Sequence, residues 1–142
     1  MPEERSIQRR RLLWVGPLTV LAAIGAVLVV RVAAVAALRL QPQTFQPLGW
    51  FFPIFDTLIL VTAAVIVFVF VAHSANRPIR TYRRIALAAL VLSMIPDLRI
   101  HARRPELFTW PRTSALMLMH VVAWRVTVTM LTKLTTCSKS ED

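Results

Sequence analysis

Four long apolar blocks, separated by short segments rich in arginine and proline, limit what this chain can fold into. The blocks cover residues 12–38, 53–72, 85–100 and 113–132. A helix that crosses the hydrocarbon core of a bilayer needs about 20 mostly apolar residues, and the blocks lie near that length. The third block is the shortest. The sequence therefore predicts an all-α integral membrane protein with four spans.

Composition supports a membrane protein and argues against other classes. Of the 142 residues, 56% are apolar and only 17% are charged, whereas soluble domains carry about 25% charged residues. The apolar residues run continuously instead of alternating, so a transmembrane β-barrel is a poor fit. We predict one membrane domain over residues 1–142, with polar termini at 1–11 and 133–142.

The connections between the blocks indicate how the spans are arranged. Gln41–Gly49 contains two prolines and a glycine, a composition typical of a turn. Pro53 suits the first position of a helix, where its missing amide has no partner to lose. Because all three connections are short, consecutive spans should lie antiparallel in an up-and-down four-helix bundle.

Lysine and arginine residues near the span ends indicate the orientation, because cytoplasmic segments of membrane proteins are enriched in them. The larger group lies on the side of both termini, which predicts that the termini are cytoplasmic. We expect these clusters to contact anionic lipid headgroups, and we expect no nucleic-acid partner. The side with the termini holds Arg5, Arg9, Arg10, Arg11, Arg77, Arg80, Arg83, Arg84, Lys133 and Lys139, and the other side holds Arg39, Arg99, Arg103, Arg104 and Arg112.

Asp97 and His120 are the strongest candidates for a functional site, because ionisable side chains inside a bilayer are costly. At 1.5 Å per residue, both lie about 20 Å from the cytoplasmic face. Their spans are consecutive, so we expect the two side chains to meet. Ser93 lies one turn from Asp97 on the same face. Three interpretations remain open: a proton-titrating or ligand-binding pocket, a structural contact between two helices, or a water-exposed Asp97 at the end of a short helix.

Arg31 and Asp56 form a second candidate pair, for which we predict a structural ion pair. Their depths are about 30 Å and 25 Å from the cytoplasmic face. Side chains lean toward the N-terminus of their helix, which brings these two closer. Asp56 also lies in the first turn after Pro53, where a carboxylate favours the helix dipole without any further role.

Arg125 has no acidic residue at matching depth on another span. It lies about 12 Å from the cytoplasmic face. We expect it to contact either a lipid phosphate or an acidic group on another subunit.

Signatures of catalysis are absent from the sequence. Cys137 is the single cysteine, so no internal disulfide, CxxC pair or zinc cluster is expected. No glycine-rich phosphate loop, nucleophile elbow or HExxH motif occurs. We therefore expect no enzyme activity, no cofactor and no metal site.

Three segments carry a resemblance to a known group of proteins. They are the basic start RRRLLW at Arg9–Trp14, the stretch Arg77–Leu98, and LMLMHVVA at Leu116–Ala123. On these the chain resembles a family of uncharacterised four-pass bacterial membrane proteins, found largely in actinobacteria. The resemblance implies that Asp97 and His120 lie in recurring segments. It implies no activity. Our own expectation is that the chain resides in the inner membrane of a bacterial cell.

Two functions of different classes follow from these expectations. The first is a structural or interaction component of a membrane assembly, which the missing catalytic motifs and Arg125 favour. The second is a small proton-coupled transporter or ligand-binding protein that uses Asp97 and His120. For either function the chain could act as a homo-oligomer or within a larger membrane complex.

Overall fold

The computed structural model of the chain describes residues 9–37, 39 and 49–135, and within them it contains four helices. These are α1 (Arg9–Ala37), α2 (Phe51–Ser74), α3 (Pro78–Arg103) and α4 (Trp110–Leu134). The turn predicted over residues 41–49, most of the two polar termini and Cys137 lie outside the described residues. The all-α fold class is as the sequence predicts.

All four helices are long and apolar enough to cross a membrane, which fits a four-pass membrane protein. The largest difference from the predicted spans is at α3, which extends beyond residues 85–100 at both ends. Pro78 lies in its first turn, where proline is favoured. The arginines at both ends do not stop the helix, because arginine is a good helix former whose long side chain can extend to the headgroups.

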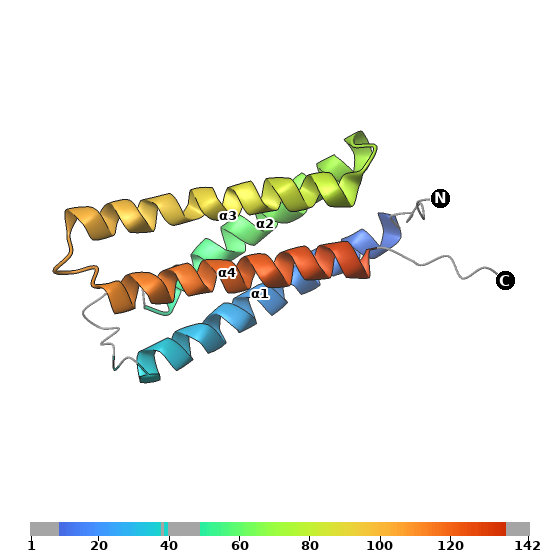
Figure 1. Cartoon of the computed structure of the whole chain (residues 1–142). Helices are drawn as coiled ribbons and strands as arrows, with labels where there is room; N and C mark the ends of the chain where they lie inside the picture. The colour runs from blue at the N-terminus through green and yellow to red at the C-terminus, as the bar shows by residue number, and fades with distance from the viewer. Residues whose placement is uncertain (1–8, 38, 40–48, 136–142) are drawn as a thin grey trace.

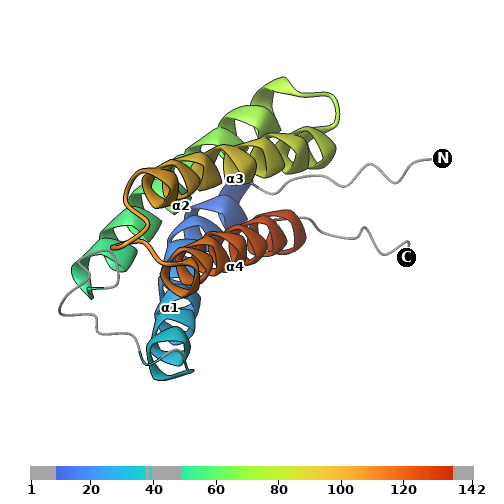
Figure 2. The same cartoon turned by 60° about the vertical axis from the view of Figure 1, so that its left-hand side comes forward.

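The helices form an up-and-down ring in which each helix packs against its neighbours in sequence and α1 also packs against α4. Figures 1 and 2 show α1 and α4 side by side, while α2 and α3 diverge from their short connection. We call the end that holds the start of α1, the end of α4 and the α2–α3 connection the termini end. The opposite end, with the α3–α4 connection, is the far end.

All four helices contribute to the hydrophobic core at the termini end. Leu131 and Phe68 are fully buried there, and the ring of Phe68 meets that of Tyr82 edge-on with centroids 4.8 Å apart. Such aromatic pairs stabilise beyond the area that they bury. This end of the bundle is closed by close packing, with the buried cluster consisting of Val15, Phe68, Val71, Tyr82, Val128 and Leu131.

The far half of the bundle is packed differently. Its buried cluster contains Val27 of α1 and Met119 of α4, with Phe108 from the α3–α4 connection packed against them. Neither α2 nor α3 contributes a residue to this cluster. The divergence of these two helices therefore leaves space in the far half, and the candidate site lies in that space.

Candidate functional site

A cavity of about 390 Å³ lies in the far half of the bundle. Its walls come mainly from α2, α3 and α4, with one residue from α1 and one from the α3–α4 connection. Ligand pockets are commonly about 300–1,000 Å³ and mostly apolar, with few polar groups, and this cavity has that character. The lining residues are Val27, Phe52, Pro53, Asp56, Thr57, Leu60, Val61, Ser93, Pro96, Asp97, Ile100, Phe108, Leu116, Met119, His120 and Ala123.

Asp97 and His120 meet at the wall of this cavity. Asp97 Oδ2 lies 3.4 Å from His120 Nε2, and the two side chains are 16% and 20% exposed. Asp97 is six residues before the end of α3, so it does not lie at a frayed helix end. The structure therefore brings together the two residues that the sequence placed at equal depth, and it argues against the water-exposed alternative for Asp97.

The contact between Asp97 and His120 is longer than an ordinary hydrogen bond, for which donor and acceptor lie about 2.7–3.2 Å apart. Among the residues that the structure describes, Asp97 Oδ2 has no hydrogen-bond partner although the atom is buried. A buried carboxylate oxygen without a partner is unusual in proteins. The group is thus positioned to bind a proton or a ligand from the cavity.

Ser93 also lines the cavity, as its position one turn from Asp97 predicts. Its hydroxyl donates to the carbonyl of Leu90 at 2.8 Å, within its own helix. Because the hydroxyl of Ser93 is already bonded, it contributes to the wall of the cavity more than to the Asp97–His120 contact. In the same helix, α3 continues through Pro96, which has no amide hydrogen to donate to the carbonyl of Leu92.

Asp56 belongs to this cavity, which corrects the predicted Arg31–Asp56 ion pair. Asp56 is exposed and lines the cavity, and its carboxylate interacts electrostatically with both His120 and Asp97. Within the described part of the chain, the ion pair within 4.0 Å is His120–Asp97, and none joins Arg31 to Asp56. The depths of the two residues are similar, but depth does not determine which way a helix face points.

Arg31 instead packs against an aromatic ring. It is only 4% exposed, and its guanidinium carbon lies 3.8 Å from the centroid of the Trp50 ring. Such cation–π contacts contribute about 0.5–2 kcal/mol. Trp50 directly precedes α2, so this contact connects the far half of α1 to the start of α2.

The cavity opens between α2 and α3. Lining residues on the α1 and α4 side, such as Val27 and Met119, are buried, whereas Phe52 of α2 and Ile100 of α3 are exposed. These two helices also diverge toward the far end in both views (Figures 1 and 2). In a bilayer this opening would face the lipid near the far membrane surface, because Asp56 lies only five residues after the start of α2.

The α3–α4 connection covers the far end of the cavity and is fixed by His101, a residue that the sequence did not single out. His101 Nδ1 contacts the carbonyl oxygen of Phe108, so this nitrogen carries the proton and donates. The same nitrogen lies 3.4 Å from Thr113 Oγ1, and the His101 ring packs on that of Trp110 with centroids 4.2 Å apart. These contacts hold Phe108 against the cavity.

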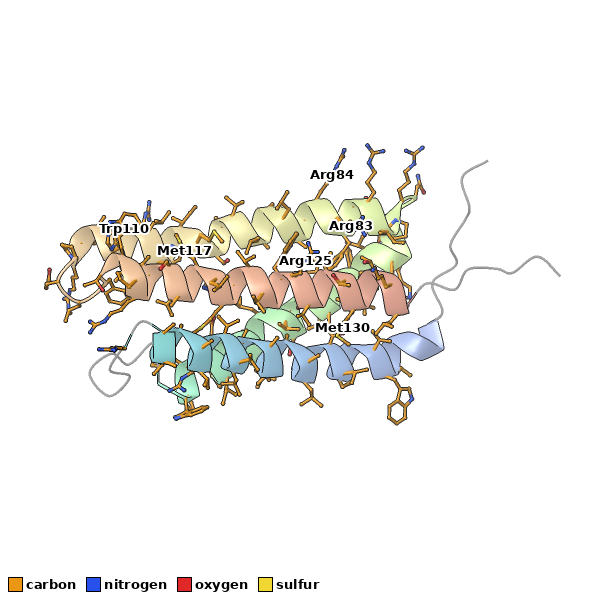
Figure 3. All side chains as sticks on the ribbon, turned by 60° about the horizontal axis from the view of Figure 1, so that its bottom comes forward. Arg83, Arg84, Trp110, Met117, Arg125 and Met130 are labelled. Carbon is orange, nitrogen blue, oxygen red and sulfur yellow. The ribbon has the colours of Figure 1, made fainter. Side chains whose placement is uncertain are left out.

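Arg125 lies outside the cavity, exposed on α4 (Figure 3). None of the ion pairs between described residues involves it. Figure 3 also shows Arg84 pointing away from the bundle near the start of α3, and Trp110 at the far end.

The chemistry available in the cavity is proton exchange and electrostatic binding. Asp56, Asp97 and His120 share the cavity but do not form a metal-ligating group, and no such group of three occurs in the part of the chain that the structure describes. Asp97 and His120 can share one proton, either as carboxylate and imidazolium or as carboxylic acid and imidazole. The two forms differ in charge distribution but not in net charge.

Comparison with known proteins gives the family of this chain. Residues 5–136 match a family described as "Family of unknown function (DUF6069)". The chain belongs to the DUF6069 family. No curated protein and no solved structure matches it. The DUF6069 assignment covers all four helices, and with them every residue of the cavity.

Proposed function

We propose that this DUF6069 protein binds a small molecule inside the membrane, in the cavity between α2, α3 and α4, with the Asp97–His120 pair as its proton-titrating group. One observation carries the proposal: three titratable side chains from three helices converge on one mostly apolar cavity. Ionisable side chains within membrane spans mark ligand and proton sites more often than other positions do. The protein acts by binding rather than by catalysis, and it uses no cofactor.

The loose packing of the far half supports this proposal over a purely structural role. A bundle that served only as a scaffold would gain stability by closing the cavity with larger apolar residues, because unfilled space weakens a core. Here the four-helix core is confined to the termini end.

Cysteine accessibility tests whether the cavity admits small molecules. On a Cys137→Ser background in lipid nanodiscs, Ala123→Cys places a thiol in the cavity wall, and Val29→Cys places one on the exposed, lipid-facing side of α1. We expect N-ethylmaleimide to modify Ala123→Cys at least about tenfold faster, because a thiol in lipid does not ionise readily. Equal rates at the two positions would contradict a cavity that small molecules can reach.

A second function, as an interaction component of a membrane assembly, is supported by Arg125. An exposed arginine within a span is costly in lipid, and an acidic group on another subunit would reduce that cost. Native mass spectrometry after mild extraction tests this. A hetero-complex or homo-oligomer that dissociates in Arg125→Gln, but not in the control Arg84→Gln, would support it, and a monomer would contradict it.

The orientation that we propose places the termini end in the cytoplasm of a bacterial cell, with the chain in the inner membrane. The bias of lysine and arginine toward the termini end supports this orientation. The cavity would then open near the outer surface of that membrane, and the basic termini end would contact anionic headgroups.

A further inference from the structure

We propose that the ligands of this cavity are lipophilic organic monocations, which enter from the bilayer through the opening between α2 and α3. This inference rests on the proposed function, because it names the class of molecule that the same cavity binds. It follows from the charge, the lining and the opening of the cavity.

The charged groups around the cavity leave one negative charge unbalanced. With one proton shared between Asp97 and His120, this pair has no net charge in either of its two forms. Asp56 then adds a carboxylate, for which the described residues provide no ion-pair partner. No lysine or arginine is among the described lining residues, and on α1 the nearby Arg31 lies against Trp50. A single positive charge on a ligand would balance Asp56.

The position of Asp56 strengthens this argument. Asp56 is exposed and lines the cavity on α2, one of the two helices between which the cavity opens. In a membrane this opening faces lipid, where a carboxylate without a counter-charge is unfavourable. A cation that reaches the opening would therefore encounter the negative charge first at Asp56, and Asp97 lies beyond it in the cavity wall.

The side chains that line the cavity indicate the chemical character of the uncharged part of the ligand. Apart from the titratable groups, Ser93 and Thr57, the walls are aliphatic or aromatic. Phe52 and Phe108 line the cavity, and aromatic faces attract organic cations as well as apolar groups. Among the described residues no group of three His, Cys, Asp or Glu side chains could hold a small metal ion. A cation with a bulky apolar body fits both the walls and a route through lipid.

Two isosteric ions of opposite charge provide the test, tetraphenylphosphonium and tetraphenylborate. Each is added to Ala123→Cys, on the Cys137→Ser background in nanodiscs, and its protection of the thiol against N-ethylmaleimide is measured. We expect tetraphenylphosphonium to protect, and tetraphenylborate to protect at least about tenfold less at equal concentration in the membrane.

Variants show whether the acidic residues cause the selectivity. Asp56→Asn should raise the concentration for half-protection by at least about tenfold, because it removes the unbalanced charge. Asp97→Asn should have a smaller effect, because the pair with a neutral His120 still has no net charge. Glu106→Gln is the matched control, because it removes one exposed carboxylate at the same end of the molecule without touching the cavity. It should leave protection unchanged.

The outcomes separate this inference from the function on which it rests. If Ala123→Cys reacts rapidly but neither ion protects it, or both protect it equally, the cation inference is overturned and a small-molecule cavity remains. If Ala123→Cys reacts no faster than Val29→Cys, the proposed function itself fails. Loss of protection in Glu106→Gln as large as in Asp56→Asn would show that the selectivity is a surface-charge effect and would also overturn the inference.

Discussion

At the scale of single residues, the contact between Asp97 and His120 combines a structural and a chemical role that substitutions can separate. Polar contacts between membrane helices contribute about 0.6–2 kcal/mol. The 3.4 Å distance here favours the lower part of that range. The carboxamide of asparagine can keep the contact with His120 but cannot take up a proton at neutral pH, whereas leucine can do neither.

The first prediction concerns stability in mixed micelles. Asp97→Leu should lower the free energy of unfolding by about 1 kcal/mol, and Asp97→Asn by less than about half of that. Ser93→Ala is the control, because the Ser93 hydroxyl is already bonded to Leu90 within α3. Equal and negligible effects of Asp97→Asn and Asp97→Leu, on stability and on ligand protection, would contradict any role for the pair.

The second prediction concerns His101, which fixes the α3–α4 connection over the cavity. His101→Ala removes the donor to the Phe108 carbonyl and the packing on Trp110, so we expect a loss of about 1–2 kcal/mol of stability. It should also accelerate modification of Ala123→Cys, because Phe108 covers the cavity. His73→Ala is the matched control: His73 is exposed and contacts the carbonyl of Val69 in its own helix at 2.7 Å. A His101 variant indistinguishable from the His73 variant would contradict this role.

At the scale of helices, α1 and α2 come into close contact at Gly16. A Cβ atom built on Gly16 would lie 3.2 Å from Val65 Cγ1, whereas one built on Gly25 would have no neighbour within 4 Å. Replacing a glycine by alanine within a helix favours the helix by about 0.5–1 kcal/mol.

The third prediction compares these two glycines. Gly25→Ala should raise the free energy of unfolding by about 0.5–1 kcal/mol, because it adds helix propensity without a clash. Gly16→Ala should gain less or become destabilising, since Val65 has to move. Denaturant titrations of both variants measure the difference. A Gly16→Ala variant that is as stable as Gly25→Ala would show that α1 and α2 do not pack closely there.

The helices also show which parts of the structure the sequence could predict. Hydropathy and short connections predict four antiparallel helices, because apolar length and loop length determine both. The ends of α3 were missed because Arg80 and Arg103 lie inside the helix and were assigned to loops. The cavity is not visible in the sequence, because it arises from the angle between α2 and α3.

The candidate site, too, could be predicted from the sequence only in part. Residue rise along two consecutive helices gives relative depth, and the equal depths of Asp97 and His120 predicted their contact. Depth alone gives no rotation about the helix axis, so the sequence paired Asp56 with Arg31. The structure places Asp56 at the cavity and Arg31 on Trp50. The roles of His101 and Phe108 depend on the shape of a connection that no periodic pattern describes.

At the scale of the whole molecule, closed packing at the termini end and an open far half give the bundle two different ends. The termini end holds the four-helix core, and most of the lysines and arginines lie on its side. If that end is cytoplasmic, ligands would reach the cavity from the outer surface of the membrane or from its outer leaflet.

The fourth prediction therefore concerns topology. Reporter fusions at residue 142 and within the α2–α3 connection should behave as cytoplasmic, and a fusion within residues 104–109 should behave as periplasmic, because of the lysine and arginine bias. A periplasmic readout from the C-terminal fusion would invert the orientation and place the opening of the cavity near the cytoplasmic surface.

The most direct test of the central claim is a solid-state NMR correlation between the imidazole nitrogens of His120 and the carboxyl carbon of Asp97, measured in lipid bilayers across a pH series. The structure predicts a cross-peak between His120 Nε2 and the Asp97 carboxyl, since the nitrogen and Oδ2 lie 3.4 Å apart. The two groups should also change chemical shift together, because they share a proton. The absence of a cross-peak at every pH, or independent titration of the two groups, would contradict the account.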